Sequence, residues 1–383
     1  MTGLGIEKLM FQGKFEEAWR VVKSFEKSGR TDKVGEALNE ISTYYLCQGE
    51  LDQALKYGLK SLATLEGIGH KVGVANAKDT VGFIYYMKGE LDFAEDYFHQ
   101  SMREFNSLGK PFGRVYPPAH LADVYQAKGD FIRAIEYANQ ALILCEEEEF
   151  YALASQVLYR LVSLTLDIQE IEDAKDYFQR LQILSLTKIK THEYKKYVNQ
   201  LCRLAEGHIL KYSPRLRDKM KAQEIFKEIA EERMVFFPNT FDAMISLCEL
   251  LLIELSVSEE ETILHDVKNL VNKLIELSRQ QQSHSSVVNA LIIQTKFAMI
   301  EGDLTKAFEF LEQAEVIAKE KKLNQLVDRV VEEKKLIQDQ FNEWETLVQS
   351  NASFQIRIKQ AQVDEYLLEA LKLVKMNQRA PGP

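Results

Sequence analysis

Glycine and proline are scarce in this sequence, with 18 and 7 residues respectively among 383. A many-stranded β fold depends on such turn residues, so their scarcity argues against it and favours helices joined by short loops. Cysteine is also scarce, and no CxxC pair is present. Each cysteine lies far from the others in an apolar stretch, so we expect buried, reduced thiols rather than disulfides or a zinc site. The four are Cys47, Cys145, Cys202 and Cys248.

The sequence lacks a sustained basic stripe, and its formal net charge is -10. Both features argue against nucleic acid as a partner. Residues 1–19 lack the basic region and apolar core of a secretory signal. The longest apolar run, 247–255, contains Glu249 and Glu254 and is too short to cross a bilayer. We therefore expect a cytoplasmic protein without membrane insertion.

Signatures of catalysis and of cofactor binding are missing as well. The seven histidines show no HExxH spacing, and no phosphate-binding loop, dinucleotide fingerprint or GxSxG elbow occurs. The acidic run 146–149 would point around a helix in several directions, so it predicts a solvated segment rather than a metal site. We expect no catalytic residue, metal or cofactor, and we expect His120 to make a hydrogen bond on the surface or in a groove.

One short sequence motif, which we call the phrase, does recur along the chain. It consists of Gly, a polar or acidic residue, Phe or Leu, two variable residues, and then Ala. The first five copies follow one another at intervals of 36, 40, 40 and 40 residues, counted as 49−13, 89−49, 129−89 and 169−129. A register this regular predicts a helical repeat. The copies begin at Gly13, Gly49, Gly89, Gly129, Gln169 and Gly302.

The phrase predicts a tight turn between two antiparallel helices. Gly adopts the left-handed conformation that ends the first helix, and the acidic residue caps the second. The Ala is small because the two helices approach closely there. Apolar, small and aromatic residues precede the turns at helical spacing, which places them on one helix face. They are Ile41, Ser42 and Tyr45, then Val81, Gly82 and Tyr85, then Leu121, Ala122 and Tyr125.

These residues resemble the tetratricopeptide repeat, most closely over 36–185. The third copy carries the family pattern in Val81, Gly82, Tyr85, Ala94 and Phe98. The fourth and second copies depart from it, because Ala138 and Gly58 replace the aromatic residue of the second helix. The period exceeds the usual family value of about 34, as in the long-repeat variety of kinesin light chains. The resemblance implies an all-α fold, a right-handed superhelical α-solenoid of stacked antiparallel helix pairs.

The register divides the chain into successive regions. Turns at 13, 49, 89, 129 and 169 define a well-matched array, and Ala222 and Phe226 would belong to a degenerate sixth copy. Ile337, Phe341, Trp344 and Val348 follow a four-three spacing that predicts a coiled-coil-like or capping face. The last region is an amphipathic helix with Val363, Leu367, Ala370, Leu371 and Val374, which either seals the open end of the solenoid or serves as a dimerisation or docking helix. The regions are 1–185 (matched array), 186–284 (degenerate pairs), 285–350 (last repeat and a long helix), 351–376 (capping or docking helix) and 377–383 (disordered tail).

The resemblance also implies where a partner would bind. In this family the groove residues lie two, three, six, ten and thirteen positions before the turn glycine. Aromatic groove residues would expose contact surface, and asparagine amides would hydrogen-bond a peptide backbone as both donor and acceptor. The alternative is that these side chains only pack against the neighbouring helix. The candidates are Asn39, Thr43, Asn76, Asp79, Phe83, Tyr86, Tyr116, Asp123 and Gln126.

Charge and proline at these positions refine the expectation. Glu36, Asp79 and Asp123 would repel an acidic tail, so a basic or amphipathic segment is the better candidate partner. The pair Pro117 and Pro118 would shorten the first helix of the fourth copy. The leading hypothesis is thus a non-enzymatic scaffold or adaptor that binds a peptide or helix. The alternatives are a sensory module whose curvature responds to a ligand, and a homo-oligomer formed through the C-terminal helices.

Overall fold

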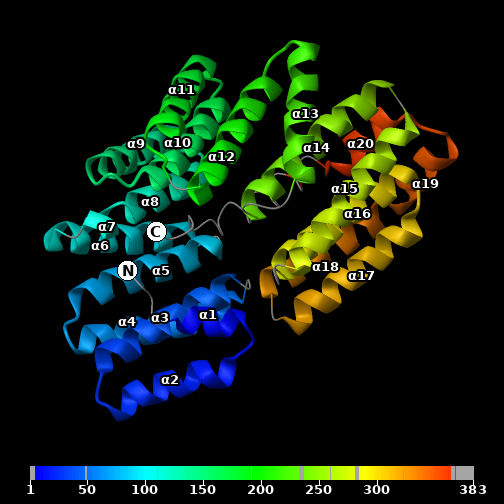
Figure 1. Cartoon of the computed structure of the whole chain (residues 1–383). Coiled ribbons are helices and arrows are strands. Elements are labelled where there is room, and N and C mark those ends of the chain that lie inside the picture. The colour runs from blue at the N-terminus through cyan, green and yellow to red at the C-terminus, as the bar shows by residue number, and fades with distance from the viewer. Residues whose placement is uncertain are drawn as a thin grey trace. The chain divides into compact units, whose positions relative to one another are not determined.

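The computed structural model is all-α, and consecutive helices pack against one another (Figure 1), which confirms the predicted helical-repeat fold class. The chain divides into two compact units, unit 1 (Met1–Tyr194) and unit 2 (Lys195–Pro383). None of the described helices is both long and apolar enough to cross a membrane. The structure describes residues 5–47, 50–88, 90–109, 111–190, 192–232, 237–258, 260–280, 284–321, 323–363 and 367.

Unit 1 is a stack of antiparallel helix pairs, in which we call the first helix of each pair A and the second B. Ser42 Oγ donates to the carbonyl of Ala54 at 2.7 Å, and Ser61 Oγ donates to that of Gly35 at 2.7 Å, which ties the two ends of one pair. The A helices are α1 (Ile6–Phe11), α3 (Thr31–Cys47), α5 (Lys71–Met87), α8 (Tyr116–Ala127) and α10 (Tyr151–Asp167). The others are α2 (Phe15–Lys27), α4 (Leu51–Gly67), α6 (Leu91–Leu108), α7 (Pro111–Arg114), α9 (Phe131–Glu147) and α11 (Ile171–Thr187).

The turns of the repeated phrase have the predicted left-handed conformation at each of the four copies whose turn residue the structure describes. The φ angles are 73° at Gly13, 76° at Gly129 and 89° at Gly302, and Gln169 adopts 63° without being glycine. Gly49 and Gly89 lie outside the described residues. The alanine of the phrase is fully buried in all six copies, which confirms the close approach of the two helices. These are Ala18, Ala54, Ala94, Ala134, Ala174 and Ala307.

The predicted caps form only where the acidic residue is aspartate. Asp130 accepts a hydrogen bond from the Arg133 N–H at 3.1 Å, and Asp303 accepts one from Lys306 at 3.0 Å. Glu50 and Glu90 occupy the same position without a side-chain cap. The extra methylene of glutamate lengthens the side chain, and glutamate is accordingly not among the preferred N-cap residues.

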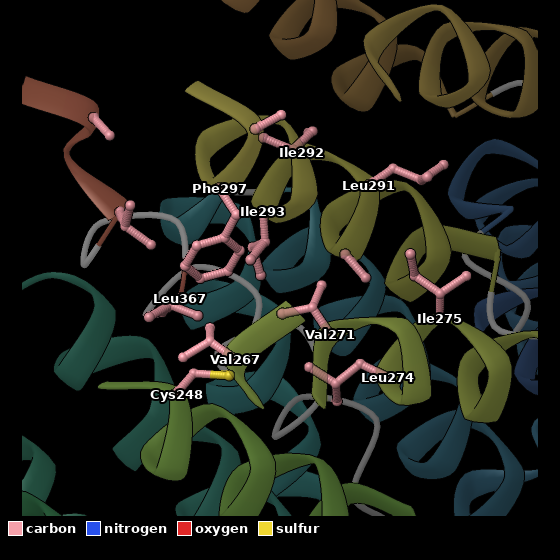
Figure 2. Close-up of a cluster of buried hydrophobic side chains, with 14 of the residues drawn as sticks. Cys248, Val267, Val271, Leu274, Ile275, Leu291, Ile292, Ile293, Phe297 and Leu367 are labelled. Carbon is pink, nitrogen blue, oxygen red and sulfur yellow. The ribbon is translucent and has the colours of Figure 1, made fainter. Parts of the chain in front are cut away.

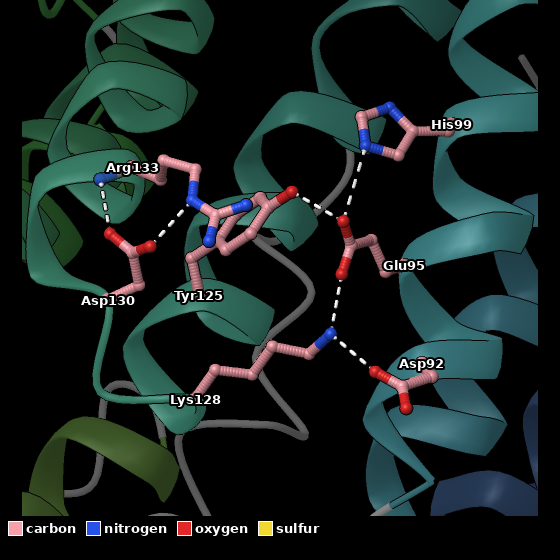
Figure 3. A network of polar contacts seen from close by, with 7 residues as sticks. All are labelled: Asp92, Glu95, His99, Tyr125, Lys128, Asp130 and Arg133. Carbon is pink, nitrogen blue, oxygen red and sulfur yellow. Dashed lines mark hydrogen bonds and ion pairs between the residues drawn. The ribbon is translucent and has the colours of Figure 1, made fainter.

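A polar network joins consecutive helix pairs beside these turns (Figure 3). Lys128 Nζ donates to Asp92 at 2.7 Å and to Glu95 at 2.5 Å, and the Tyr125 hydroxyl donates to Glu95 at 2.5 Å. Burial acts to raise the pKa of Glu95, but the bonds from Lys128 and Tyr125 outweigh it and lower that pKa. One repeat earlier, Lys88 donates to an aspartate in the same way, at 2.8 Å. In the third and fourth copies the lysine before the turn thus links the repeat to the preceding one.

Unit 2 also consists of helix pairs, although the repeated motif is too degenerate over 186–284 to define their register from the sequence. Ala222 and Phe226 are fully buried, and Phe226 packs on Gly207 of the preceding helix. The long helix expected before Ser350 is divided at Gln340. The helices are α12 (His192–Lys211), α13 (Leu216–Glu231), α14 (Phe237–Ser258), α15 (Glu261–Gln280), α16 (His284–Glu301), α17 (Leu304–Glu320), α18 (Asn324–Asp339), α19 (Phe341–Gln349) and α20 (Phe354–Ala361).

The end of unit 2 is closed by apolar side chains. Ile337 and Trp344 of the predicted stripe are fully buried, whereas Phe341 remains 37% exposed. In the C-terminal region Val363 and Leu367 join the core of unit 2 (Figure 2). The predicted contributions of Ala370, Leu371 and Val374 lie outside the described residues.

The cysteines differ from one another more than the sequence predicted. Cys145 and Cys248 are fully buried, but Cys47 and Cys202 are only half-buried. The expectation of four buried thiols is therefore wrong for two of them. The sequence placed all four in apolar helices, but apolar neighbours along the chain do not show which side of a helix is covered.

Candidate functional site

The nine predicted groove residues lie on three consecutive A helices of unit 1. α3 packs against α5 and α5 against α8, which brings the groove positions of these helices onto one side of the stack. We call this side the A-helix face of unit 1. Its predicted residues are Asn39 and Thr43 on α3; Asn76, Asp79, Phe83 and Tyr86 on α5; and Tyr116, Asp123 and Gln126 on α8.

His120 of α8 joins two of these residues on α5. Its Nδ1 lies 3.1 Å from Asp79 Oδ1, and its ring centroid lies 5.1 Å from that of Phe83. The ring also approaches Phe98 at 5.0 Å and Tyr116 at 6.3 Å. His120 therefore makes the hydrogen bond predicted for it, and the bond occupies the carboxylate of Asp79.

Arg160 of α10 makes the corresponding link to α8. Its Nε lies 3.0 Å from Asp123 Oδ1, and its Nη1 donates to the carbonyl of Ala119 at 2.9 Å. Gln126 Nε2 donates to Asp167 Oδ2 on α10 at 2.8 Å. Asp123 and Gln126 are thus engaged in contacts between neighbouring A helices.

Of the three aromatic residues expected to expose contact surface, Phe83 and Tyr86 are buried and Tyr116 is half-buried. Phe83 and Tyr86 are each only 8% exposed. Burial raises the pKa of Tyr86 well above its ordinary value, and the nearby Asp123 carboxylate raises it further while Arg160 opposes both. The expectation of an exposed aromatic pair is wrong because side chains of the next A helix cover it.

The carboxylates that suggested a basic partner are already paired. Glu36 accepts from Lys33 at 2.5 Å, Asp79 faces His120, and Asp123 forms an ion pair with Arg160. Glu36 and Asp123, each with a cation at hydrogen-bond distance, offer little net field to a ligand, and Asp79 Oδ1 is engaged by the His120 ring. The structure therefore removes the reason for preferring a basic segment.

Asn39 and Asn76 differ from the other predicted residues. Asn39 is half-buried, and its Oδ1 is buried without a hydrogen-bond partner among the described residues. Asn76 is also half-buried on the adjacent helix α5, and no side-chain hydrogen bond of it is seen in the described part of the chain. Thr43 is 2% exposed, and its Oγ1 donates to the Asn39 carbonyl at 3.1 Å, a local bond within α3. The face thus holds two amides, Asn39 and Asn76, for which no side-chain hydrogen bond is seen among the described residues, and the Oδ1 atom of Asn39 is buried.

Sequence analysis missed Arg160 as a residue of this face and gave His120 no partner. His120 lies nine positions before the turn residue Gly129, and Arg160 lies nine positions before the turn residue Gln169. Position nine is not among the groove positions of the family pattern, but it lies one residue from position ten, where Asp79 stands in the preceding copy. The available signal was a basic residue at position nine that follows an acidic groove residue of the preceding copy. His120 lies 41 residues after Asp79, and Arg160 lies 37 residues after Asp123.

Among the described residues, no group of three His, Cys, Asp or Glu side chains is placed so that it could hold a metal ion.

No protein-family model matches the chain, and no curated protein matches it. Solved structures do resemble it. A Rap protein complexed with Competence and Sporulation Factor is 14% identical with a TM-score of 0.50, over 84% of each chain. The apo quorum sensor NprR from B. thuringiensis is 14% identical with a TM-score of 0.47, over 82% of this chain and 85% of its own. BtubC from P. vanneervenii is 15% identical with a TM-score of 0.44, over 61% and 95%. At these identities the likeness concerns the helical-repeat fold alone.

Proposed function

We propose that the chain is a non-enzymatic binding protein that captures a peptide segment on the A-helix face of unit 1. The observation that carries this proposal is the pair of uncommitted amides, Asn39 on α3 and Asn76 on the adjacent α5. A Rap protein of similar fold was solved with Competence and Sporulation Factor bound. That complex supports a binding role for such a scaffold.

Asparagine suits the recognition of a peptide backbone. Its carboxamide offers two donors and one acceptor group, and every non-proline residue of a peptide presents one N–H and one C=O. The buried, unpaired Oδ1 of Asn39 carries a desolvation cost of about 1–3 kcal/mol.

Peptide affinity is expected to depend on both amides. Peptides selected from a random library for binding to the intact chain should bind about tenfold more weakly to Asn39→Ala and to Asn76→Ala, since each substitution removes about one hydrogen bond. Titration calorimetry at two salt concentrations measures this, and the affinity should change little with salt because the carboxylates of the face are paired.

Gln182→Ala provides the matched control, because this exposed amide lies on the B helix α11. Its affinity for the selected peptides should equal that of the unmodified chain. Equal affinities for all three variants would place the site elsewhere than on the A-helix face.

Loss of binding in Asn39→Ala should not come from loss of stability. Removing the unpaired buried oxygen and introducing a better helix former are expected to raise the free energy of unfolding by up to about 1 kcal/mol. Urea denaturation measures the difference. A decrease of 1 kcal/mol or more on that scale would show that the fold itself uses the amide, against its assignment to a ligand.

A further inference from the structure

The C-terminal helix α20 does not continue the helix stack of unit 2. Among the described residues it packs against α14 and α16, the A helices of two successive pairs, whereas direct packing between α14 and α16 is slight. α20 therefore fills a groove between two A helices. Position in the chain does not explain this, because α20 follows α18 and α19.

Apolar side chains of the segment enter that groove. Ala361, Val363 and Leu367 are 2%, 1% and 0% exposed, respectively. Figure 2 shows Leu367 near Phe297 of α16, in the same buried cluster as Val267 of α15 and Cys248 of α14. The segment thus reaches into the core between the two helices.

Polar contacts hold the start of the segment at the end of α16. Arg357 Nη1 donates to the carbonyl of Ile300 at 3.1 Å, and Arg357 Nε donates to that of Ala352 at 2.7 Å. Gln360 Nε2 donates to Glu343 of α19 at 3.3 Å. The opposite side of α20 faces solvent, since Ile356 is 51% exposed.

We propose that the groove between α14 and α16 is a docking surface for an amphipathic helix, and that residues 354–363 together with Leu367 of this chain occupy it as an intramolecular ligand. The arrangement follows the helix-in-groove mode, in which a few apolar anchors at helical spacing enter an apolar cleft. The anchors here are Phe354, Ile358 and Ala361, at i, i+4 and i+7, followed by Val363 and Leu367, at i and i+4.

The geometry favours exchange over permanent closure. α20 has eight residues, and Gln362 after it adopts a left-handed φ of 52°. Helices shorter than about 12–15 residues are marginal in water, so this segment is helical only while docked. A longer helix from another protein, already folded, would lose less conformational entropy on entering the same groove.

Cys248 reports whether the groove opens, because it is fully buried in the same apolar cluster that Leu367 joins. The experiment compares alkylation of each cysteine, resolved by peptide mass mapping, in the full-length chain and in Leu367→Asp. Cys145 of unit 1 is the internal reference, since it is equally buried and burial raises its pKa to about 12. Ile356→Asp places the same charge on the exposed side of α20 and serves as the matched control.

Cys248 is expected to react at least about tenfold faster in Leu367→Asp, with Cys145 unchanged and the far-UV spectrum retained. A synthetic peptide of residues 353–372 should slow that reaction again, and the same peptide carrying Leu367→Asp should not. Ile356→Asp should behave as the unmodified chain does.

Two outcomes would overturn the proposal. In one, Leu367→Asp exposes Trp344 and melts unit 2, which would make the segment a fixed part of the core. In the other, Cys248 reacts at the unmodified rate, or the peptide gives no protection once the rate has risen. Both concern unit 2 alone and leave the proposed peptide site of unit 1 untouched.

Discussion

Lys296→Ala is expected to lower the free energy of unfolding of unit 2 by about 3–5 kcal/mol. Lys296 Nζ on α16 donates to Glu333 Oε2 on α18 at 2.6 Å, and the two side chains are only 2% and 7% exposed. Alanine would leave Glu333 buried without its counter-ion. The loss would come mainly from that uncompensated charge rather than from the removed attraction.

The double substitution Lys296→Met/Glu333→Leu separates these two contributions. It removes both charges and keeps apolar volume, so it should restore most of the stability or exceed it. Fluorine-19 NMR of 5-fluorotryptophan-labelled protein in urea follows the two units separately, because the only tryptophans are Trp19 in unit 1 and Trp344 in unit 2. Only the Trp344 transition should shift.

The exposed pair Lys175 and Glu172 on α11 supplies a control of the same chemistry. Its side chains are 51% and 85% exposed, so Lys175→Ala should change the free energy of unfolding by at most about 1 kcal/mol. A cost as small as this for Lys296→Ala would show that water reaches the Glu333 carboxylate.

The helix pairs of unit 1 were predictable because each rests on local, repeated chemistry. A turn that needs a left-handed residue and a close approach that needs Ala recur every 40 residues, so one error does not disturb the register. Even Gln169, which departs from glycine, adopts the left-handed φ of 63° that its position requires. The capping failures at Glu50 and Glu90 show the limit, since the pattern fixed the acidic character but not the side-chain length.

Exposure on the A-helix face was not predictable in the same way. Whether Phe83 is open depends on His120, which lies 37 residues later on the next A helix. Whether the Asp123 carboxylate has an ion-pair partner depends on Arg160, which lies 37 residues after Asp123 in the chain. A family pattern names positions within one repeat, but burial is decided by the side chain that the following repeat places over it.

The closing of unit 2 was predictable only in part. The apolar stripe of Ile337 and Trp344 indicated a capping face, and both side chains are buried. The break at Gln340 had no signal in glycine or proline. The return of α20 to α14 and α16 is a long-range contact, for which helical periodicity carries no information.

Phe98→Ala is the second large effect, with an expected loss of about 3–5 kcal/mol in the free energy of unfolding of unit 1. Phe98 fills the aromatic slot of α6 with 0% exposure. A Cβ built on Gly82 would lie 3.0 Å from the Phe98 ring, so the ring packs tightly against the backbone of this glycine. Alanine would create a cavity between α5 and α6 that the surrounding helices can close only partly.

The same substitution connects the core to the candidate site. The Phe98 ring centroid lies 5.0 Å from that of His120, which faces Asp79 and Phe83 on α5. Below the unfolding transition, Phe98→Ala should therefore also weaken peptide binding. The exposed Phe93 of the same helix gives the control: at 57% exposure, Phe93→Ala should cost at most about 1 kcal/mol and leave peptide affinity unchanged. Equal losses in the free energy of unfolding for Phe98→Ala and Phe93→Ala would mean that packing of the Phe98 ring does not hold α6 in place. The packing of the third repeat would then need a different explanation.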